Sequence, residues 1–171
     1  EAEESFSESP EKIIEETQQP LPTYEENNLE NIEEQNFLTP LIETHKERPE
    51  VEKWRQYYLS SDKRLSLLRD ILEYGMEYRL YVRKIVNDRE LPSELEYVPV
   101  VESNYRTNAK SRSGALGMWQ FMENSVKPFL TLTEYVDERL DPWKSTEAGL
   151  SKLEDNYSFF NDWLLAVGAY N

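Results

Sequence analysis

A stripe of apolar residues between Leu65 and Val86 constrains the fold of this chain more than any other feature of its sequence. Its members recur at steps of three and four positions, which places them on one side of an α-helix and indicates that this side faces a core. The charged residues of the segment fall mostly elsewhere. We therefore predict a long helical segment that supports the chain following it. The stripe consists of Leu65, Leu68, Ile71, Leu72, Met76, Val82, Ile85 and Val86.

The second half of the chain carries further helix signals. Asp141 followed by Pro142 is typical of a helix start, because aspartate caps free backbone N–H groups and proline fits the first turn. Asp162 is expected to cap a last helix over residues 163–171, which is apolar nearly all round and is therefore predicted to be buried. Together these patterns predict an all-α fold. The inward positions expected between residues 143 and 157 are Ala148, Leu150, Leu153 and Tyr157.

A short apolar helix is predicted after the long helical segment. Leu91-Pro92 ends the preceding helix, and Ser93 followed three positions later by Glu96 has the form of a capping box. The new helix is expected to run through Leu95, Val98 and Val101.

Glu102 lies at the far end of this short helix, just after a kink predicted at Pro99. A carboxylate there faces the negative end of the helix dipole and sits beside an apolar run, and both effects disfavour its charged form. The pKa of Glu102 should therefore be raised. A carboxyl group that keeps its proton near neutral pH can act as a general acid.

The charge of the chain is unevenly distributed. Residues 1–50 carry 15 acidic and 3 basic side chains, so they hold −12 of the formal net charge of −15. An acidic protein without a cluster of Lys and Arg is a poor partner for nucleic acid or for an anionic membrane surface. Nucleic-acid binding is therefore not expected.

The composition also limits the chemistry that the chain can support. It contains no cysteine, so it cannot form a disulfide or use a thiolate, and His45 is its single histidine. We expect no metal site and no cofactor. No apolar run is long enough for a transmembrane segment, which is compatible with a mature chain that has been exported.

Three ordered motifs resemble the lytic transglycosylase domain related to goose-type lysozyme. They are Glu102-Ser103 followed by Ser111, the run GALGMWQFM over residues 114–122, and Ala169-Tyr170-Asn171. Leu91-Pro92-x-Glu94-Leu95, Pro99-x-Val101-Glu102-Ser103 and Asp137-Glu138-Arg139-x-Asp141-Pro142 are most similar to the membrane-bound lytic murein transglycosylase D branch. The resemblance covers the chain from about Val51 to its end. Two positions depart from the family pattern: Glu123 stands where a proline is usual, and Met118 stands where a leucine is usual. These differences bear on fine substrate preference.

The resemblance implies a lysozyme-like fold and a set of functional residues. Glu102 would be the catalytic acid, and peptidoglycan glycan strands would be the partner of an exported, periplasmic or cell-envelope protein. Tyr74, Tyr78 and Tyr81 either form the edge of the core or line a carbohydrate groove. Trp119 is either a core anchor or a stacking surface, and the core position is favoured. The implied substrate-binding residues are Ser103, Ser111, Gly117, Gln120, Met122, Tyr170 and Asn171.

The expected organisation has three parts. Residues 1–50, rich in charged and polar side chains, are predicted to form a disordered or loosely docked tail that can contact cell-envelope proteins. Residues 51–90 would form a helical buttress, and residues 91–171 the catalytic core. Because members of the family carry further helices after the last motif, we expect the core to be incomplete at its C-terminus.

Only one acid is placed by motif, and the family resemblance implies how this acid would cleave the glycan. Glu102 would protonate the leaving oxygen, the N-acetyl group of N-acetylmuramic acid would assist, and the 6-hydroxyl of that sugar would close a 1,6-anhydro ring. One alternative is a goose-type lysozyme-like hydrolase, which would need a second carboxylate such as Glu147 or Asp137. The other is a peptidoglycan-binding or scaffold protein without turnover.

Overall fold

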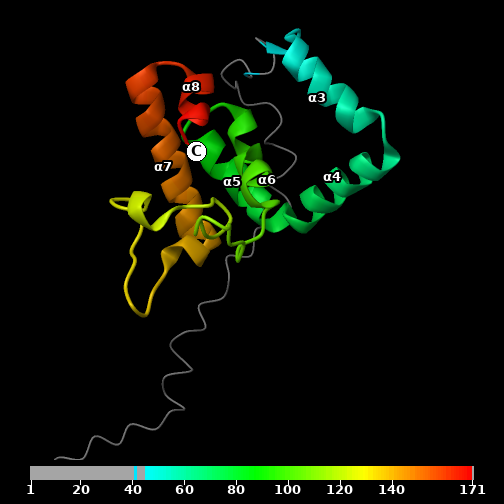
Figure 1. The fold of residues 1–171 in the computed structure, drawn as a ribbon. Coiled ribbons are helices and arrows are strands. Elements are labelled where there is room, and N and C mark those ends of the chain that lie inside the picture. Colours follow the sequence, from blue (N-terminus) through cyan, green and yellow to red (C-terminus); the bar gives the residue numbers. More distant parts are fainter. Residues whose placement is uncertain (1–40, 42–44, 171) are drawn as a thin grey trace, which may run out of the picture. The chain divides into compact units, whose positions relative to one another are not determined.

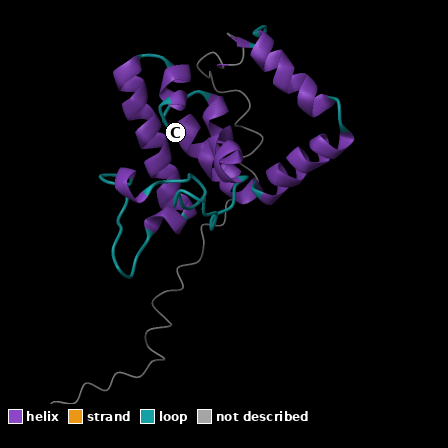
Figure 2. Cartoon of the chain, viewed as in Figure 1, coloured by secondary structure: helices purple, strands orange, loops and turns teal. Residues whose placement is uncertain are grey.

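The structure is a computed structural model that describes Leu41 and residues 45–170 (Figure 1). Within these residues, helices joined by loops form the fold, and β-structure is limited to isolated bridges (Figure 2). The all-α prediction is confirmed. The elements are α3 (Pro49–Leu59), α4 (Asp62–Tyr74), α5 (Met76–Asp88), α6 (Val98–Ser103), α7 (Pro142–Phe160) and α8 (Trp163–Gly168), with 3-10 helices η2 (Ser93–Tyr97), η3 (Glu123–Ser125) and η4 (Glu138–Leu140).

The apolar stripe is divided between two helices, so the long helical segment predicted over residues 65–86 is interrupted. The helix is interrupted at Gly75, and a Cβ atom at this position would collide with the buried ring of Tyr105. No residue of α4 is buried, whereas α5 buries Val82, Ile85 and Val86. Only the second half of the stripe therefore supports the core.

The core is built around Trp119, as predicted. Its side chain is fully buried, and its indole Nε1 donates a hydrogen bond of 3.0 Å to the Thr146 hydroxyl of α7. Gly149 lets α7 approach the indole closely, because a Cβ atom at this position would overlap the ring. The residues buried with Trp119 include Leu95, Met118, Phe121, Leu150 and Leu153.

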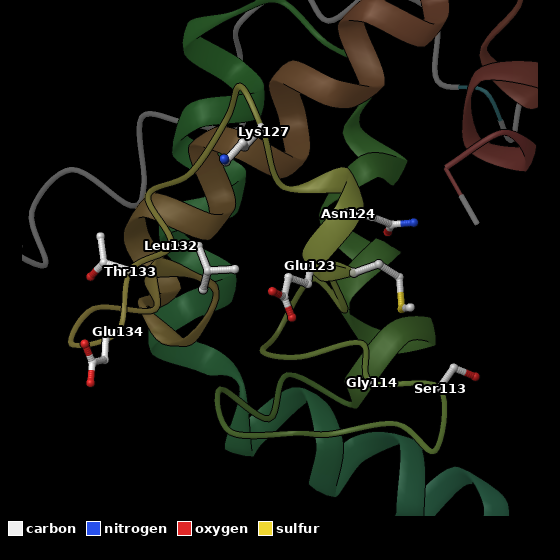
Figure 3. A pocket seen from close by; sticks show the side chains of 9 residues that line it. Ser113, Gly114, Glu123, Asn124, Lys127, Leu132, Thr133 and Glu134 are labelled. Carbon is white, nitrogen blue, oxygen red and sulfur yellow. The ribbon is translucent and has the colours of Figure 1, made fainter.

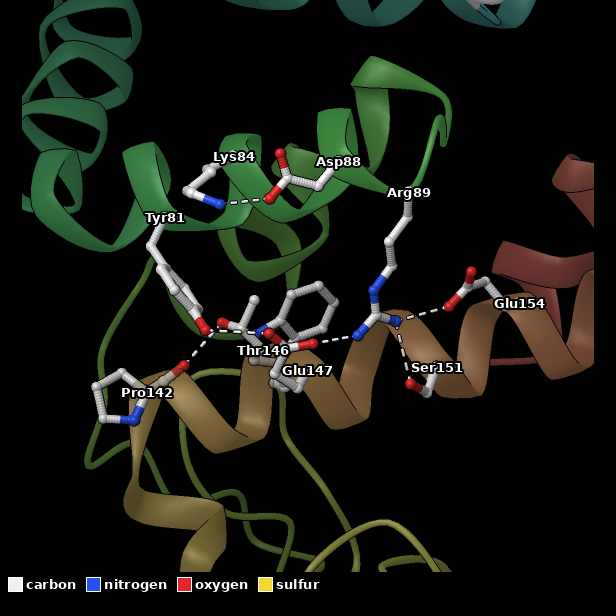
Figure 4. Close-up of polar contacts among 10 residues, drawn as sticks. Tyr81, Lys84, Asp88, Arg89, Pro142, Thr146, Glu147, Ser151 and Glu154 are labelled. Carbon is white, nitrogen blue, oxygen red and sulfur yellow. Dashed lines mark hydrogen bonds and ion pairs between the residues drawn. The ribbon is translucent and has the colours of Figure 1, made fainter. Parts of the chain in front are cut away.

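Polar contacts join α5, and Arg89 directly after it, to α7 (Figure 4). Arg89 pairs with Glu147 and with Glu154, the latter at 2.7 Å, and donates a hydrogen bond of 3.1 Å to Ser151. The Tyr81 hydroxyl donates to the same Glu147 carboxylate at 3.1 Å. These contacts fix α7 against the buttress and occupy the Glu147 side chain.

The three tyrosines between residues 74 and 81 have different surroundings. The rings of Tyr78 and Tyr81 pack against Trp143 of α7, at centroid distances of 5.8 and 4.8 Å. They lie at the edge of the core. Tyr74, in contrast, is 62% exposed.

The segment from Ser93 to Glu96 contains no capping box, so this prediction is wrong. The Ser93 hydroxyl donates to Glu94, while the Glu96 carboxylate is buried and pairs with Arg83 at 2.6 Å and with Arg79 at 3.4 Å. The Glu96 carboxylate therefore binds two arginines on α5 and does not cap the helix start.

The short helix also differs from the prediction around Pro99. Pro99 lies in the first turn of α6, directly after η2, and does not kink the interior of a longer helix. Proline is tolerated in a first turn because its missing N–H has no partner there. Val101 is 83% exposed and so does not face the core. Glu102 nevertheless stands at the C-terminal end of this helix, as predicted.

The caps of the two last helices are confirmed. Asp141 accepts hydrogen bonds from the backbone N–H groups of Trp143 and Lys144, at 2.9 and 3.0 Å, and Asp162 accepts one from Leu165 at 2.9 Å. Helix α8 folds back against α7 (Figure 1).

Helix α8 is less buried than its composition predicts. Within its six described residues only Ala166 is buried, while Leu164 and Leu165 are 41% and 56% exposed. The expectation of burial on all sides is therefore wrong, because the described residues cover one side of this helix. None of the described helices combines the length and hydropathy that crossing a bilayer requires.

The predicted acidic tail falls mainly outside the described residues. Its described portion is Leu41 and the chain from His45 onward, and α3 begins at Pro49, shortly before the predicted boundary at Val51.

Candidate active site

Glu102 is partly buried near the end of α6, where the chain leaves the helix through Asn104 in the left-handed conformation (φ 55°, ψ 39°). Burial raises the pKa of the Glu102 carboxyl, and the positive charge of Lys152 partly opposes this rise. The direction matches the sequence prediction. The proton-holding form of Glu102 is thus favoured relative to an exposed glutamate.

Two hydroxyl groups, one of them on the residue that follows Glu102, bind consecutive backbone carbonyls. Ser103 donates a hydrogen bond of 2.7 Å to the carbonyl of Met118, and Tyr170 donates one of 2.9 Å to the carbonyl of Trp119. The end of α6 and Tyr170, two residues after α8, are therefore bound to the same buried stretch of chain.

Tyr170 is buried against Trp119 and Phe121, with ring centroids 6.2 and 6.1 Å away. Burial raises the pKa of the Tyr170 hydroxyl well above its ordinary value, and the charge of Glu102 adds to this rise. Tyr170 therefore stays protonated and acts as a hydrogen-bond donor at neutral pH.

Lys152 is a polar member of this site that the sequence analysis missed. Its ammonium group, carried by α7, donates a hydrogen bond of 2.8 Å to the backbone carbonyl of Tyr170 and lies 4.3 Å from the centre of the Tyr170 ring. Burial lowers the pKa of Lys152, and the charge of Glu102 partly offsets this. The sequence does contain a signal for this inward position. Lys152 lies four positions after the inward Ala148, which places both residues on the same side of the helix.

Gly117 lies in a turn and is buried. Its φ of +82° suits glycine, and a Cβ atom there would collide with the backbone carbonyl of Arg139. Its N–H donates a hydrogen bond of 2.9 Å to the carbonyl of Ala109. The turn that contains Gly117 thus packs tightly against η4, the 3-10 helix that precedes α7.

The side chains of Gln120 and Ser111 both bind the loop that contains them. The Gln120 amide donates to the carbonyls of Gly117 and Ala109, at 2.8 and 3.2 Å. The Ser111 hydroxyl accepts from the backbone N–H of Ala115 at 2.9 Å. Both therefore shape the loop next to the site.

Met122 lines an open hollow with a volume of about 930 Å³ (Figure 3). Glu123, Lys127 and Glu134 give this hollow a mixed charge. Asn171, the remaining predicted binding residue, lies outside the described residues. The other lining residues are Ser113, Gly114, Asn124, Leu132 and Thr133.

The two carboxylates considered as a second acid are engaged elsewhere. Asp137 binds the Arg139 guanidinium at 2.8 and 2.6 Å, and Glu147 binds Tyr81 and Arg89. Within the described part of the chain, no group of three or more His, Asp or Glu side chains is arranged to hold a metal ion.

Comparison with known proteins agrees with the motif resemblance. The membrane-bound lytic murein transglycosylase D of Escherichia coli strain K12 is 33% identical over 127 residues, which are 73% of this chain and 27% of that protein. The protein of the same name from Escherichia coli O6:H1 strain CFT073 gives the same values. A relative from Alteromonas sp. strain M-1, named for tributyltin chloride resistance, is 34% identical over 96 residues, which are 55% of this chain and 46% of the relative.

The chain spans about a quarter of the length of the Escherichia coli relatives that it matches. Residues 81–171, more than half of the chain, match the family model described as the transglycosylase SLT domain. This match includes α7, α8 and the whole segment around Glu102. The chain belongs to the transglycosylase SLT domain family.

Proposed function

We propose that this chain carries the catalytic centre of a peptidoglycan lytic transglycosylase. The reaction cleaves the β-1,4 bond between N-acetylmuramic acid and N-acetylglucosamine and leaves 1,6-anhydromuramoyl ends. The observation that carries this proposal is the state of Glu102, a partly buried carboxyl whose pKa burial raises, at the end of a helix in a transglycosylase-family domain.

In the first step, Glu102 gives its proton to the glycosidic oxygen as the bond from that oxygen to the anomeric carbon breaks. The leaving sugar departs as a neutral alcohol, and the N-acetyl oxygen of N-acetylmuramic acid bonds to the anomeric carbon. A raised pKa supports this step, because a proton must be present on Glu102 before it can be given away.

In the second step, the Glu102 carboxylate removes the proton of the 6-hydroxyl on the same N-acetylmuramic acid. The 6-oxygen bonds to the anomeric carbon and displaces the N-acetyl oxygen, which closes the 1,6-anhydro ring. Glu102 regains its proton, so the cycle closes without water and without a second protein carboxylate.

The remaining predicted site residues bind the glycan in this proposal. Met122 supplies an apolar surface in the open hollow that it lines. The hydroxyl oxygens of Ser103 and Tyr170 keep acceptor capacity after donating to Met118 and Trp119. The other proposed binding residues are Ser111, Gly117, Gln120 and Asn171.

The hydrolytic alternative is less well supported. A hydrolase needs a second carboxylate to activate water or to act as a nucleophile. Asp137 and Glu147 are both held by arginines, Asp137 by Arg139 and Glu147 by Arg89. Their engagement favours transglycosylation.

Because the substrate is cell-wall glycan, we place the protein in the bacterial cell envelope, with the acidic tail available to other envelope proteins.

The test is digestion of purified peptidoglycan sacculi followed by mass spectrometry of the released muropeptides. We expect 1,6-anhydro ends from the wild-type protein and a loss of release of about a thousandfold in Glu102→Gln. The matched control is Glu90→Gln, an exposed acid in the same family segment but outside the hollow, which should leave release nearly unchanged. Reducing ends would favour the hydrolase, and sacculus binding without release would favour a scaffold protein.

A further inference from the structure

We propose that a second hollow, formed by one side of α4 and by the loop after α6, binds an N-acetylated sugar of the glycan strand. This α4 hollow has a volume of about 360 Å³, and pockets that hold small ligands typically measure about 300–1,000 Å³. It shares no lining residue with the hollow that Met122 lines. The proposal rests on the proposed function, because it takes the glycan strand as the ligand.

One wall of the α4 hollow is a single side of helix α4. Its lining residues follow one another at helical spacing, which places their side chains on the same side of the helix. No residue of α4 is buried, so this side is open to a ligand. Tyr74 is the exposed one of the three tyrosines for which the sequence left a carbohydrate groove open. The residues of this wall are Leu67, Asp70, Ile71 and Tyr74.

The other wall is the loop that directly follows α6, with Asn104, Arg106 and Asn108 as its lining residues. Tyr105, between the first two of them, is fully buried, and its hydroxyl donates a hydrogen bond to the backbone carbonyl of Glu96. The Tyr105 ring also fills the space beside Gly75, the residue after α4. Tyr105 therefore fixes the loop next to the end of α4.

The backbone of this loop is held in an uncommon conformation. Asn104 and Tyr105 both have a positive φ, 55° and 61°, which is rare and strained for a residue as large as tyrosine. Their N–H groups donate hydrogen bonds of 3.1 Å to the carbonyls of Val100 and Pro99. The surrounding structure thus maintains a strained turn, and this turn precedes the polar side chains of the α4 hollow.

The polar groups of the α4 hollow suit a sugar. Asp70 lies on one wall and Arg106 on the other, and among the described residues neither forms an ion pair within 4.0 Å. The carboxylate can accept from sugar hydroxyls, while the guanidinium and the asparagine amides can donate to hydroxyl and acetyl oxygens. The ring of Tyr74 offers an apolar face to a sugar ring.

A neutral sugar fits this hollow better than the peptide part of peptidoglycan does. Asp70 and Arg106 contribute one charge of each sign, so the hollow favours a ligand without net charge. Peptide stems carry several carboxylates, which Asp70 and the net charge of −15 disfavour. The wall on α4 also precedes residue 81, where the match to the family model begins. The hollow therefore adds a sugar contact from outside the matched domain.

The test uses a trimer of β-1,4-linked N-acetylglucosamine, which is added to the full chain while backbone amide NMR spectra are recorded. We expect the amide signals of Asn104, Arg106 and Asn108 to shift as the trimer binds. Two exposed residues of the other wall are then changed, in Tyr74→Ala and Asp70→Asn. The matched controls are Tyr58→Ala on α3 and Asp155→Asn on α7, which are exposed and lie outside both hollows.

Tyr74→Ala should weaken trimer binding at these amides about tenfold, because it removes the aromatic face. Asp70→Asn should weaken it about fivefold, because a charged acceptor becomes a neutral amide of the same shape. Unshifted loop amides would overturn the inference, as would equal dissociation constants in Tyr74→Ala and Tyr58→Ala. Shifts caused by the free peptide stem but not by the trimer would also overturn it.

Failure of this inference is distinguishable from failure of the proposed reaction. The trimer contains no N-acetylmuramic acid, so its binding does not require the proposed cleavage. Trimer binding at the α4 hollow without anhydro ends from sacculi would support this inference and overturn the reaction. Anhydro ends without trimer binding would support the reaction and overturn this inference.

Discussion

The hydroxyl of Ser103 donates a hydrogen bond of 2.7 Å to the backbone carbonyl of Met118, across fifteen positions of sequence. This bond fastens the residue next to Glu102 to the buried stretch that contains Trp119. The orientation of the acid therefore depends on the core.

Ser103→Ala should remove this bond and leave the Met118 carbonyl without its donor. We expect a loss of about 1 kcal/mol in the free energy of unfolding, measured by urea denaturation. The matched control is Ser158→Ala on α7, whose exposed hydroxyl donates to the carbonyl of Glu154 at 2.9 Å. Its stability should be nearly unchanged, and equal losses in both variants would contradict the role given to Ser103.

Gly117→Ala should destabilise the protein by at least about 2 kcal/mol, because the φ of +82° disfavours a side chain and the new Cβ would strike the Arg139 carbonyl. Gly168→Ala is the control, since no atom lies within 4 Å of the Cβ position there. Thermal unfolding compares the two variants. A Gly117→Ala protein as stable as Gly168→Ala would refute the tight packing of this turn.

Arg83→Met should destabilise the protein by about 3 kcal/mol, because it leaves the buried Glu96 carboxylate with Arg79 alone. The pair of Arg55 with Glu52 is exposed on α3, so Arg55→Met should change the free energy of unfolding by less than about 1 kcal/mol. Urea denaturation at neutral pH measures both. Equal effects would show that the Glu96 contacts add little.

The raised pKa of Glu102 has a consequence for stability. Burial, partly opposed by Lys152, lifts the folded-state pKa above the ordinary value of 4.5, so the folded protein holds this proton more tightly than the unfolded chain. The resulting contribution to stability is present below pH 4.5 and is lost as the pH rises through the folded-state pKa. Glu102→Gln cannot ionise and should therefore gain stability relative to wild type across that interval. A pH-independent difference between the two proteins would contradict the pKa shift.

Local signals in the sequence were sufficient for the helix caps. Asp141 and Asp162 bond to N–H groups two or three positions away, so neighbouring residues alone determine the contact. The sequence allowed two positions for Trp119, a core anchor or a stacking surface, and the structure shows the core anchor.

Such local signals do not predict contacts between segments that are distant in the sequence. The Glu96 carboxylate does not make the predicted capping bond, because Arg83, thirteen positions earlier on α5, binds it instead. The break at Gly75 depends on the ring of Tyr105, and the place of Lys152 depends on the backbone of Tyr170. Each of these relationships requires the packed fold.

In the proposed reaction, Glu102 and the substrate complete the cleavage without water. Digestion of sacculi in water enriched in heavy oxygen tests this directly, with mass spectrometry of the new muramic acid ends. We predict anhydro ends that contain no heavy oxygen and that disappear in Glu102→Gln. Heavy oxygen at the anomeric carbon of newly formed reducing ends would contradict the account.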